Sequence, residues 1–163
     1  MNAPIATVSL AAPAVPDAIK VSPNEKLLFA LKGRGFQVYE WVPKKDNPKQ
    51  SEWIHTPLAD LFDADGKKVG SHYGGPTWES NDGSKVICSL KAHAASPDAN
   101  AVPWLLLPVA KHEGQGIMSN VTSIQRLETA GGKEPSEESG PATAGKPVRV
   151  PYTATYYFYV SKP

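Results

Sequence analysis

The sequence predicts a single all-β domain: an antiparallel sandwich or barrel of about eight to ten strands, with long loops and little helix. Three observations support this prediction. The 163 residues include 16 prolines and 13 glycines, which favour frequent turns and leave little room for long helices. Asp-Gly pairs at residues 65–66 and 82–83 each separate two strand-like segments, as expected for tight hairpins. Residues 148–160 are mostly β-branched and aromatic.

The chain divides into a proline- and alanine-rich arm, residues 1–17, and one β domain, residues 18–163. Pro4, Pro13 and Pro16 favour extended or polyproline conformations in the arm. Two placements of the arm stay open. It lies on its own domain, or it packs on a neighbouring subunit and adds a strand to an exposed sheet edge, which would make a homo-oligomer.

Two interpretations compete for residues 25–41. Residues 22–25, Ser-Pro-Asn-Glu, fit a capping box followed by a short helix. Residues 36–41 instead alternate apolar with polar side chains, and the run Lys-Gly-Arg-Gly at 32–35 resembles a turn. We favour a hairpin between residues 26–31 and 36–41.

The rest of the domain contains further strand signals separated by polar connections. The two Asp-Gly turns predict hairpins between residues 58–62 and 67–71 and between residues 77–80 and 84–88. The apolar run at 103–107 is bounded by prolines and predicts a strand buried on both faces. Residues 119–129 and 148–160 are the remaining strand candidates. The predicted loops are residues 42–51, 92–102 and 130–146.

Charge, cysteine content and hydropathy argue against several classes of function. The net charge is +1, so we predict no nucleic-acid partner. Cys88 is the only cysteine, which rules out a disulfide within the chain and a cysteine-based zinc site. No apolar run reaches the roughly 18 residues of a spanning helix, so no membrane span is expected. The first 21 residues do not resemble a secretory signal, so the chain as numbered is expected to be cytoplasmic, or exported if a leader was removed.

The main candidate for a ligand-binding site is the segment 72–79, His-Tyr-Gly-Gly-Pro-Thr-Trp-Glu. His72, Tyr73, Trp78 and Glu79 supply an imidazole, a phenol, an indole and a carboxylate around two glycines that permit close backbone approach. The structural alternative is a strand corner in which Trp78 fills the core and the polar side chains satisfy buried groups.

Trp53 and His55 form a second candidate pair, two residues apart on one strand face. Their rings suit a sugar or conjugated ligand, or simply the edge of a core. The four histidines of the chain are widely spaced and form no local metal motif, so we predict neither a metal site nor a cofactor.

The expected function is non-catalytic binding of a small apolar or aromatic ligand or a carbohydrate. The alternative is a structural or assembly protein whose N-terminal arm packs on a neighbour. An enzyme that uses His72 and Glu79 as acid and base ranks third, because both groups would have to converge on one pocket.

Several ordered phrases of the chain resemble those of the uncharacterised family known as domain of unknown function 3455, found in bacteria and fungi. These phrases lie at residues 36–39, 57–66, 70–79, 82–84, 103–107, 129–132 and 150–154. The resemblance implies no established reaction. It also implies a disulfide in relatives whose two cysteine positions correspond here to Trp41 and the stretch 136–139, so this chain lacks that covalent link.

Overall fold

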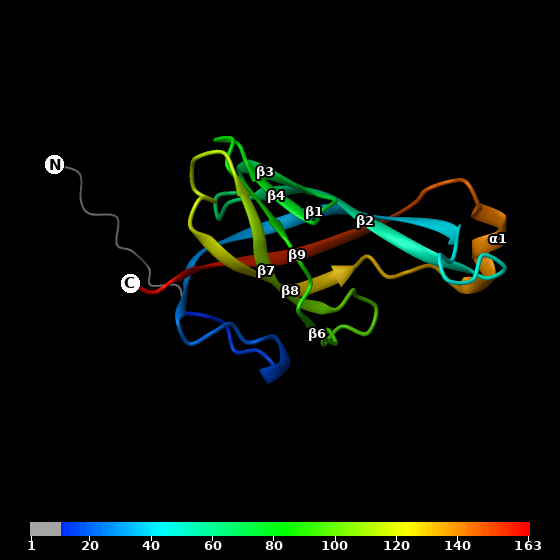
Figure 1. Cartoon of the computed structure of the whole chain (residues 1–163), viewed down its shortest axis with the longest axis horizontal. Helices are drawn as coiled ribbons and strands as arrows, with labels where there is room; N and C mark the ends of the chain where they lie inside the picture. Colours follow the sequence, from blue (N-terminus) through cyan, green and yellow to red (C-terminus); the bar gives the residue numbers. More distant parts are fainter. Residues whose placement is uncertain (1–10) are drawn as a thin grey trace.

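A computed structural model describes residues 11–163 and confirms the predicted all-β class (Figure 1). Nine strands are present in the described part of the chain. Their bounds are β1 Glu25–Pro43, β2 Ser51–Phe62, β3 Lys68–Tyr73, β4 Thr77–Ser80, β5 Lys85–Cys88, β6 Ala92–Ala94, β7 Trp104–Glu113, β8 Val121–Gly131 and β9 Val148–Ser161.

The strands form one antiparallel sheet in the order β5-β4-β3-β2-β1-β9-β8-β7-β6. Because β5 also pairs with β7, eight strands close into a barrel, and β6 is added alongside β7. Closure leaves few exposed strand edges. Both Asp-Gly hairpins form as predicted, between β2 and β3 and between β4 and β5.

The predicted hairpin within residues 26–41 is wrong, and the competing helix does not form either. β1 runs through this region as one strand, paired with β2 on one side and β9 on the other. A Cβ at Gly33 would press on the ring of Tyr156, and one at Gly35 would lie 2.6 Å from the Cα of Ala59. These glycines therefore serve close packing within a bent strand instead of a turn.

Alternate residues of each strand point into the barrel and form the main hydrophobic core. A smaller cluster lies outside, where Ile19 of the short helix η1 (Asp17–Ile19) packs with Leu106 and Leu127. Leu106 faces this outer cluster and Leu107 faces the main core. β7 is therefore buried on both faces there, as predicted. Within the predicted arm, residues 1–17, Val15 packs against this outer cluster on the chain's own barrel, whereas residues 1–10 lie outside the described part.

The predicted loop at residues 130–146 contains two short helices, η2 (Glu137–Ser139) and α1 (Gly140–Thr143). β1 and β2 extend beyond the barrel as a long ribbon, and α1 lies against its far end (Figure 1). At this contact Gly140 meets the indole of Trp41 so closely that a Cβ would not fit.

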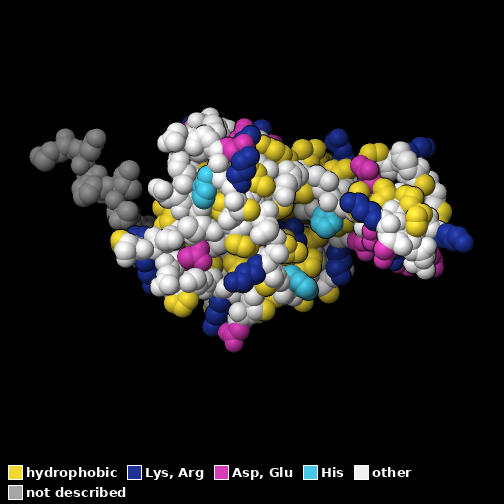
Figure 2. Space-filling view, in the orientation of Figure 1, with side chains coloured by type: hydrophobic (Ala, Val, Ile, Leu, Met, Phe, Trp, Pro, Cys, Tyr) yellow, Lys and Arg dark blue, Asp and Glu magenta, His cyan; other side chains and the backbone are white. Residues whose placement is uncertain are grey.

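The surface near β7 and β8 carries hydrophobic side chains beside Lys, Arg and His side chains (Figure 2). No helix within residues 11–163 combines the length and hydropathy needed to cross a membrane.

Candidate functional site

The β3–β4 hairpin divides the four predicted side chains of segment 72–79 between two faces of the sheet. His72 and Trp78 are cross-strand partners and are buried inside the barrel. Tyr73 and Glu79 lie on the outer face, where the Tyr73 hydroxyl donates a hydrogen bond of 2.8 Å to Glu79 Oε1. Successive side chains of a strand point to opposite faces, so the segment yields an inner pair and an outer pair.

The inner pair forms an aromatic cluster with β9. The imidazole of His72 stacks on the indole of Trp78, with ring centroids 4.1 Å apart and planes inclined by 15°. Tyr156 meets both rings edge-on, at centroid distances of 5.1 Å and 5.5 Å. These contacts fix the orientation of all three rings.

His72 is neutral at physiological pH. Burial lowers the pKa of His72 to about 3, and its Nδ1 lies 2.8 Å from the carbonyl oxygen of Thr77. Because a carbonyl oxygen only accepts, we place the proton on Nδ1, which leaves a lone pair on Nε2. His72 is thus a hydrogen-bond acceptor inside the barrel, and the sheet separates it from Glu79.

A cavity of about 350 Å³ lies beside the aromatic cluster. Side chains from β1, β2, β3, β4, β7, β8 and β9 contribute to its wall, together with the turn at residues 74–76. Leu90, Leu105 and Leu107 form the apolar part of the wall. The polar and aromatic part consists of Gln37, His55, His72, Trp78, Arg126 and Tyr156.

Two side chains of this wall carry fully buried polar atoms with no hydrogen-bond partner within residues 11–163. Gln37 is 0% exposed, and neither its Nε2 nor its Oε1 is paired. Trp78 is 1% exposed, and its Nε1 is unpaired. A buried polar group left unpaired costs about 1–3 kcal/mol. The wall thus holds donors and an acceptor that the barrel itself does not use.

Arg126 brings a positive charge to the same wall. Its Nε and Nη2 both donate hydrogen bonds to the carbonyl oxygen of Pro103, at 3.0 Å and 2.8 Å, and these bonds fix the position of the side chain. Burial raises the pKa of Tyr156, and the neighbouring charge of Arg126 opposes that rise.

Trp53 and His55 occupy different surroundings on β2. Trp53 is buried against Trp41 and Tyr39, with ring centroids 5.1 Å and 6.3 Å away, and it does not line the cavity. His55 is exposed and lies on the cavity wall. Of the six predicted residues, the structure therefore brings His55, His72 and Trp78 together around one cavity.

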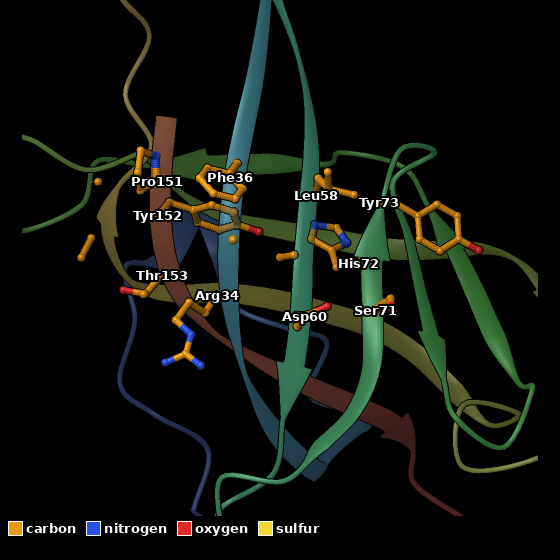
Figure 3. A pocket seen from close by; sticks show the side chains of 14 residues that line it. Arg34, Phe36, Leu58, Asp60, Ser71, His72, Tyr73, Pro151, Tyr152 and Thr153 are labelled. Carbon is orange, nitrogen blue, oxygen red and sulfur yellow. The ribbon is translucent and has the colours of Figure 1, made fainter. Parts of the chain in front are cut away.

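A larger hollow of about 830 Å³ lies mainly on the outer face of the sheet and crosses β3, β2, β1 and β9 (Figure 3). Two of its charged side chains already have partners in the protein. Asp60 pairs with Lys68 at 3.0 Å, and the Arg34 guanidinium lies 4.8 Å from the centroid of the Phe62 ring. The inner cavity is the stronger candidate because its buried polar groups are unpaired.

Metal binding has no evident location in the described part of the chain. Within residues 11–163, no group of three or more His, Cys, Asp or Glu side chains is placed to hold an ion.

Comparison with known proteins identifies a family but no function. Neither a curated protein nor a solved structure matches the chain. One family model matches residues 21–160, which is most of the sequence. The chain belongs to the family described as protein of unknown function (DUF3455).

Proposed function

We propose that this barrel binds a small aromatic molecule in the cavity beside Trp78 and does so without catalysis. The observation that carries the proposal is Gln37, a fully buried amide in the cavity wall with both polar atoms unpaired. A ligand that donates to Oε1 and accepts from Nε2 would satisfy both atoms. Binding would then recover a free energy that the unliganded barrel loses.

The rest of the wall favours a small ligand with a flat ring. His72, Trp78 and Tyr156 present aromatic surface, and Leu105 and Leu107 add apolar surface. The volume lies near the lower end of the roughly 300–1,000 Å³ typical of ligand sites. A carbohydrate fits less well, because its many hydroxyls would need more polar partners than this wall offers.

The arrangement supports binding over catalysis. Within residues 11–163 no Asp or Glu lines the cavity, and Glu79 lies on the outer face of the sheet. The Cys88 thiol stays protonated, because burial raises its pKa to about 12. The cavity wall therefore offers His72 no carboxylate with which to form an acid–base pair.

A thermal-shift and calorimetric screen tests the proposal. The probes are indole, phenol, benzamide and benzoate, with glucose as a carbohydrate comparison. We expect at least one aromatic probe to raise the melting temperature and bind, with glucose inactive. Failure of every aromatic probe would contradict the proposal.

Two matched variants locate the binding site. Leu105→Trp fills the inner cavity and should abolish binding, whereas Leu58→Trp places the same bulk in the outer hollow and should leave binding intact. The reverse pattern would assign the ligand to the outer face.

A further inference from the structure

Arg126 is a buried charge without an acidic partner. It is 6% exposed, and no carboxylate within residues 11–163 lies within 4.0 Å of it. The cavity wall, as far as the described residues form it, contains no Asp or Glu either. Burying an ionised side chain is costly unless an opposite charge or further hydrogen bonds compensate for it.

The hydrogen bonds of Arg126 leave much of its guanidinium unused. A guanidinium carries five N–H donors, arranged in a planar fork. The bonds from Nε and Nη2 to Pro103 both run to one carbonyl oxygen and use a single edge of the fork. Nη2 is thus partly used, and Arg126 also interacts with the hydroxyl of Tyr156, another residue of the cavity wall. Among residues 11–163, Nη1 makes no hydrogen bond of standard geometry, and it belongs to a side chain that lines the cavity.

The titratable groups near Arg126 do not supply a compensating negative charge. Burial raises the pKa of Tyr152 and Tyr156, so both phenols stay protonated, and their hydroxyls pair with each other at 2.8 Å. Burial lowers the pKa of His72, partial desolvation lowers that of the more exposed His55, and the charge of Arg126 adds to both effects. The positive charge of Arg126 is thus not compensated by these neighbouring phenols and imidazoles.

We infer that the ligand is a carboxylate, held by Arg126 through the edge formed by Nη1 and Nη2. This inference rests on the proposed function and specifies the charge of the ligand. A planar carboxylate matches a guanidinium edge with two parallel hydrogen bonds. A phosphate dianion fits less well, since one guanidinium would face two negative charges beside the lone pair of His72 Nε2. The ring of the same molecule lies toward Trp78 and Gln37.

Pairs of acids and amides of the same shape test the charge of the ligand. The probes are benzoate with benzamide, 4-hydroxybenzoate with 4-hydroxybenzamide, and indole-3-acetate with indole-3-acetamide. Calorimetric titration at pH 7 measures each dissociation constant. We expect the acid of at least one pair to bind about tenfold or more tightly than its amide, as a charge-assisted pair would give.

Variants connect this preference to Arg126. Arg126→Gln should remove the preference for the acid, and Arg126→Lys should keep part of it. Arg149→Gln, at an exposed arginine on β9, should leave it unchanged. If Arg126→Gln does not fold, Arg126→Lys tests the role of Arg126. Lysine provides a charge without the planar guanidinium, so it should weaken binding of the acid and leave binding of the amide unchanged.

The outcomes separate the inference from the function that it rests on. Amides that bind as tightly as their acids, or a preference that survives Arg126→Gln, would overturn the inference and leave the binding function standing. Failure of all acids and all neutral aromatic probes would overturn both.

Discussion

Gln37 provides the sharpest test of the inner cavity, because methionine has nearly the shape of glutamine but lacks the amide. The chain also holds a matched control. Gln125 is 1% exposed, but both polar atoms of its amide are paired: Nε2 donates to the carbonyl oxygen of Ile19 at 2.8 Å, and Oε1 accepts from the Tyr159 hydroxyl at 2.7 Å. Gln37→Met and Gln125→Met therefore make the same chemical change at an unpaired and a paired amide.

The two substitutions should change stability in opposite directions. Removing the unpaired amide of Gln37 relieves part of a desolvation cost of about 1–3 kcal/mol, so we expect the free energy of unfolding to rise by about 1–2 kcal/mol. For a chain of this length, that gain corresponds to a rise in melting temperature of about 2–8 °C. Gln125→Met leaves the Ile19 carbonyl and the Tyr159 hydroxyl without their partner and should cost about 1–3 kcal/mol.

Urea unfolding followed by tryptophan fluorescence measures both changes. The aromatic probes supply the second measurement, because Gln37→Met should bind them about tenfold more weakly despite its greater stability. If Gln37→Met loses as much stability as Gln125→Met, the Gln37 amide is already partnered in the folded protein. The amide would then need no ligand to pair its polar atoms, and the proposed binding at that position would be refuted.

Three further predictions follow from local contacts. Gly35→Ala should lower the free energy of unfolding by about 1–3 kcal/mol, because the new Cβ overlaps neighbouring backbone. A Cβ at Gly66 meets nothing within 4 Å, so Gly66→Ala should lower it less, despite the φ of +79°. Equal losses in melting temperature would contradict this. Stability should fall as the pH drops from 6.5 toward about 3, by up to about 1.4 kcal/mol per pH unit, because the unfolded chain binds the proton that buried His72 excludes. His72→Phe should flatten this slope in acid-dependent urea unfolding, and an unchanged slope would refute that role. Cys88 should react with a disulfide reagent only after unfolding, since burial raises its thiol pKa to about 12, so rapid labelling of the native protein would count against the structure.

The β class and most strands could be predicted from the sequence because the signals are local. An Asp-Gly turn or an aromatic, β-branched run can be recognised within a few residues. The path of β1 could not be predicted this way. Gly33 and Gly35 resemble turn residues locally, but their role comes from Tyr156 and Ala59, which are distant in sequence.

The candidate site was predicted only in part, because alternation shows two faces of a strand without showing which is inside. In residues 36–41 the alternation places Phe36 and Val38 on one face of the strand and Gln37 and Tyr39 on the other. The structure buries the second face, which holds Gln37 and Tyr39. Arg126 could have been suspected, since it shares a strand face with Ile124, which lies in the core. A charged residue on the core side of a predicted strand is the signal that would have found it.

The end of the ribbon connects to the cavity through the segment that follows β8. The Tyr39 hydroxyl donates a hydrogen bond to the carbonyl oxygen of Gly132, and a Cβ at Gly132 would lie 3.2 Å from the Cγ of Gln37. Farther along the same loop, Gly140 packs on Trp41. The resemblance implies a disulfide near these two positions in relatives, and here an aromatic contact joins them instead. The loop thus contacts β1 at Gln37 and Tyr39 through Gly132, and at Trp41 through Gly140. These contacts help to hold the Gln37 amide at the cavity wall.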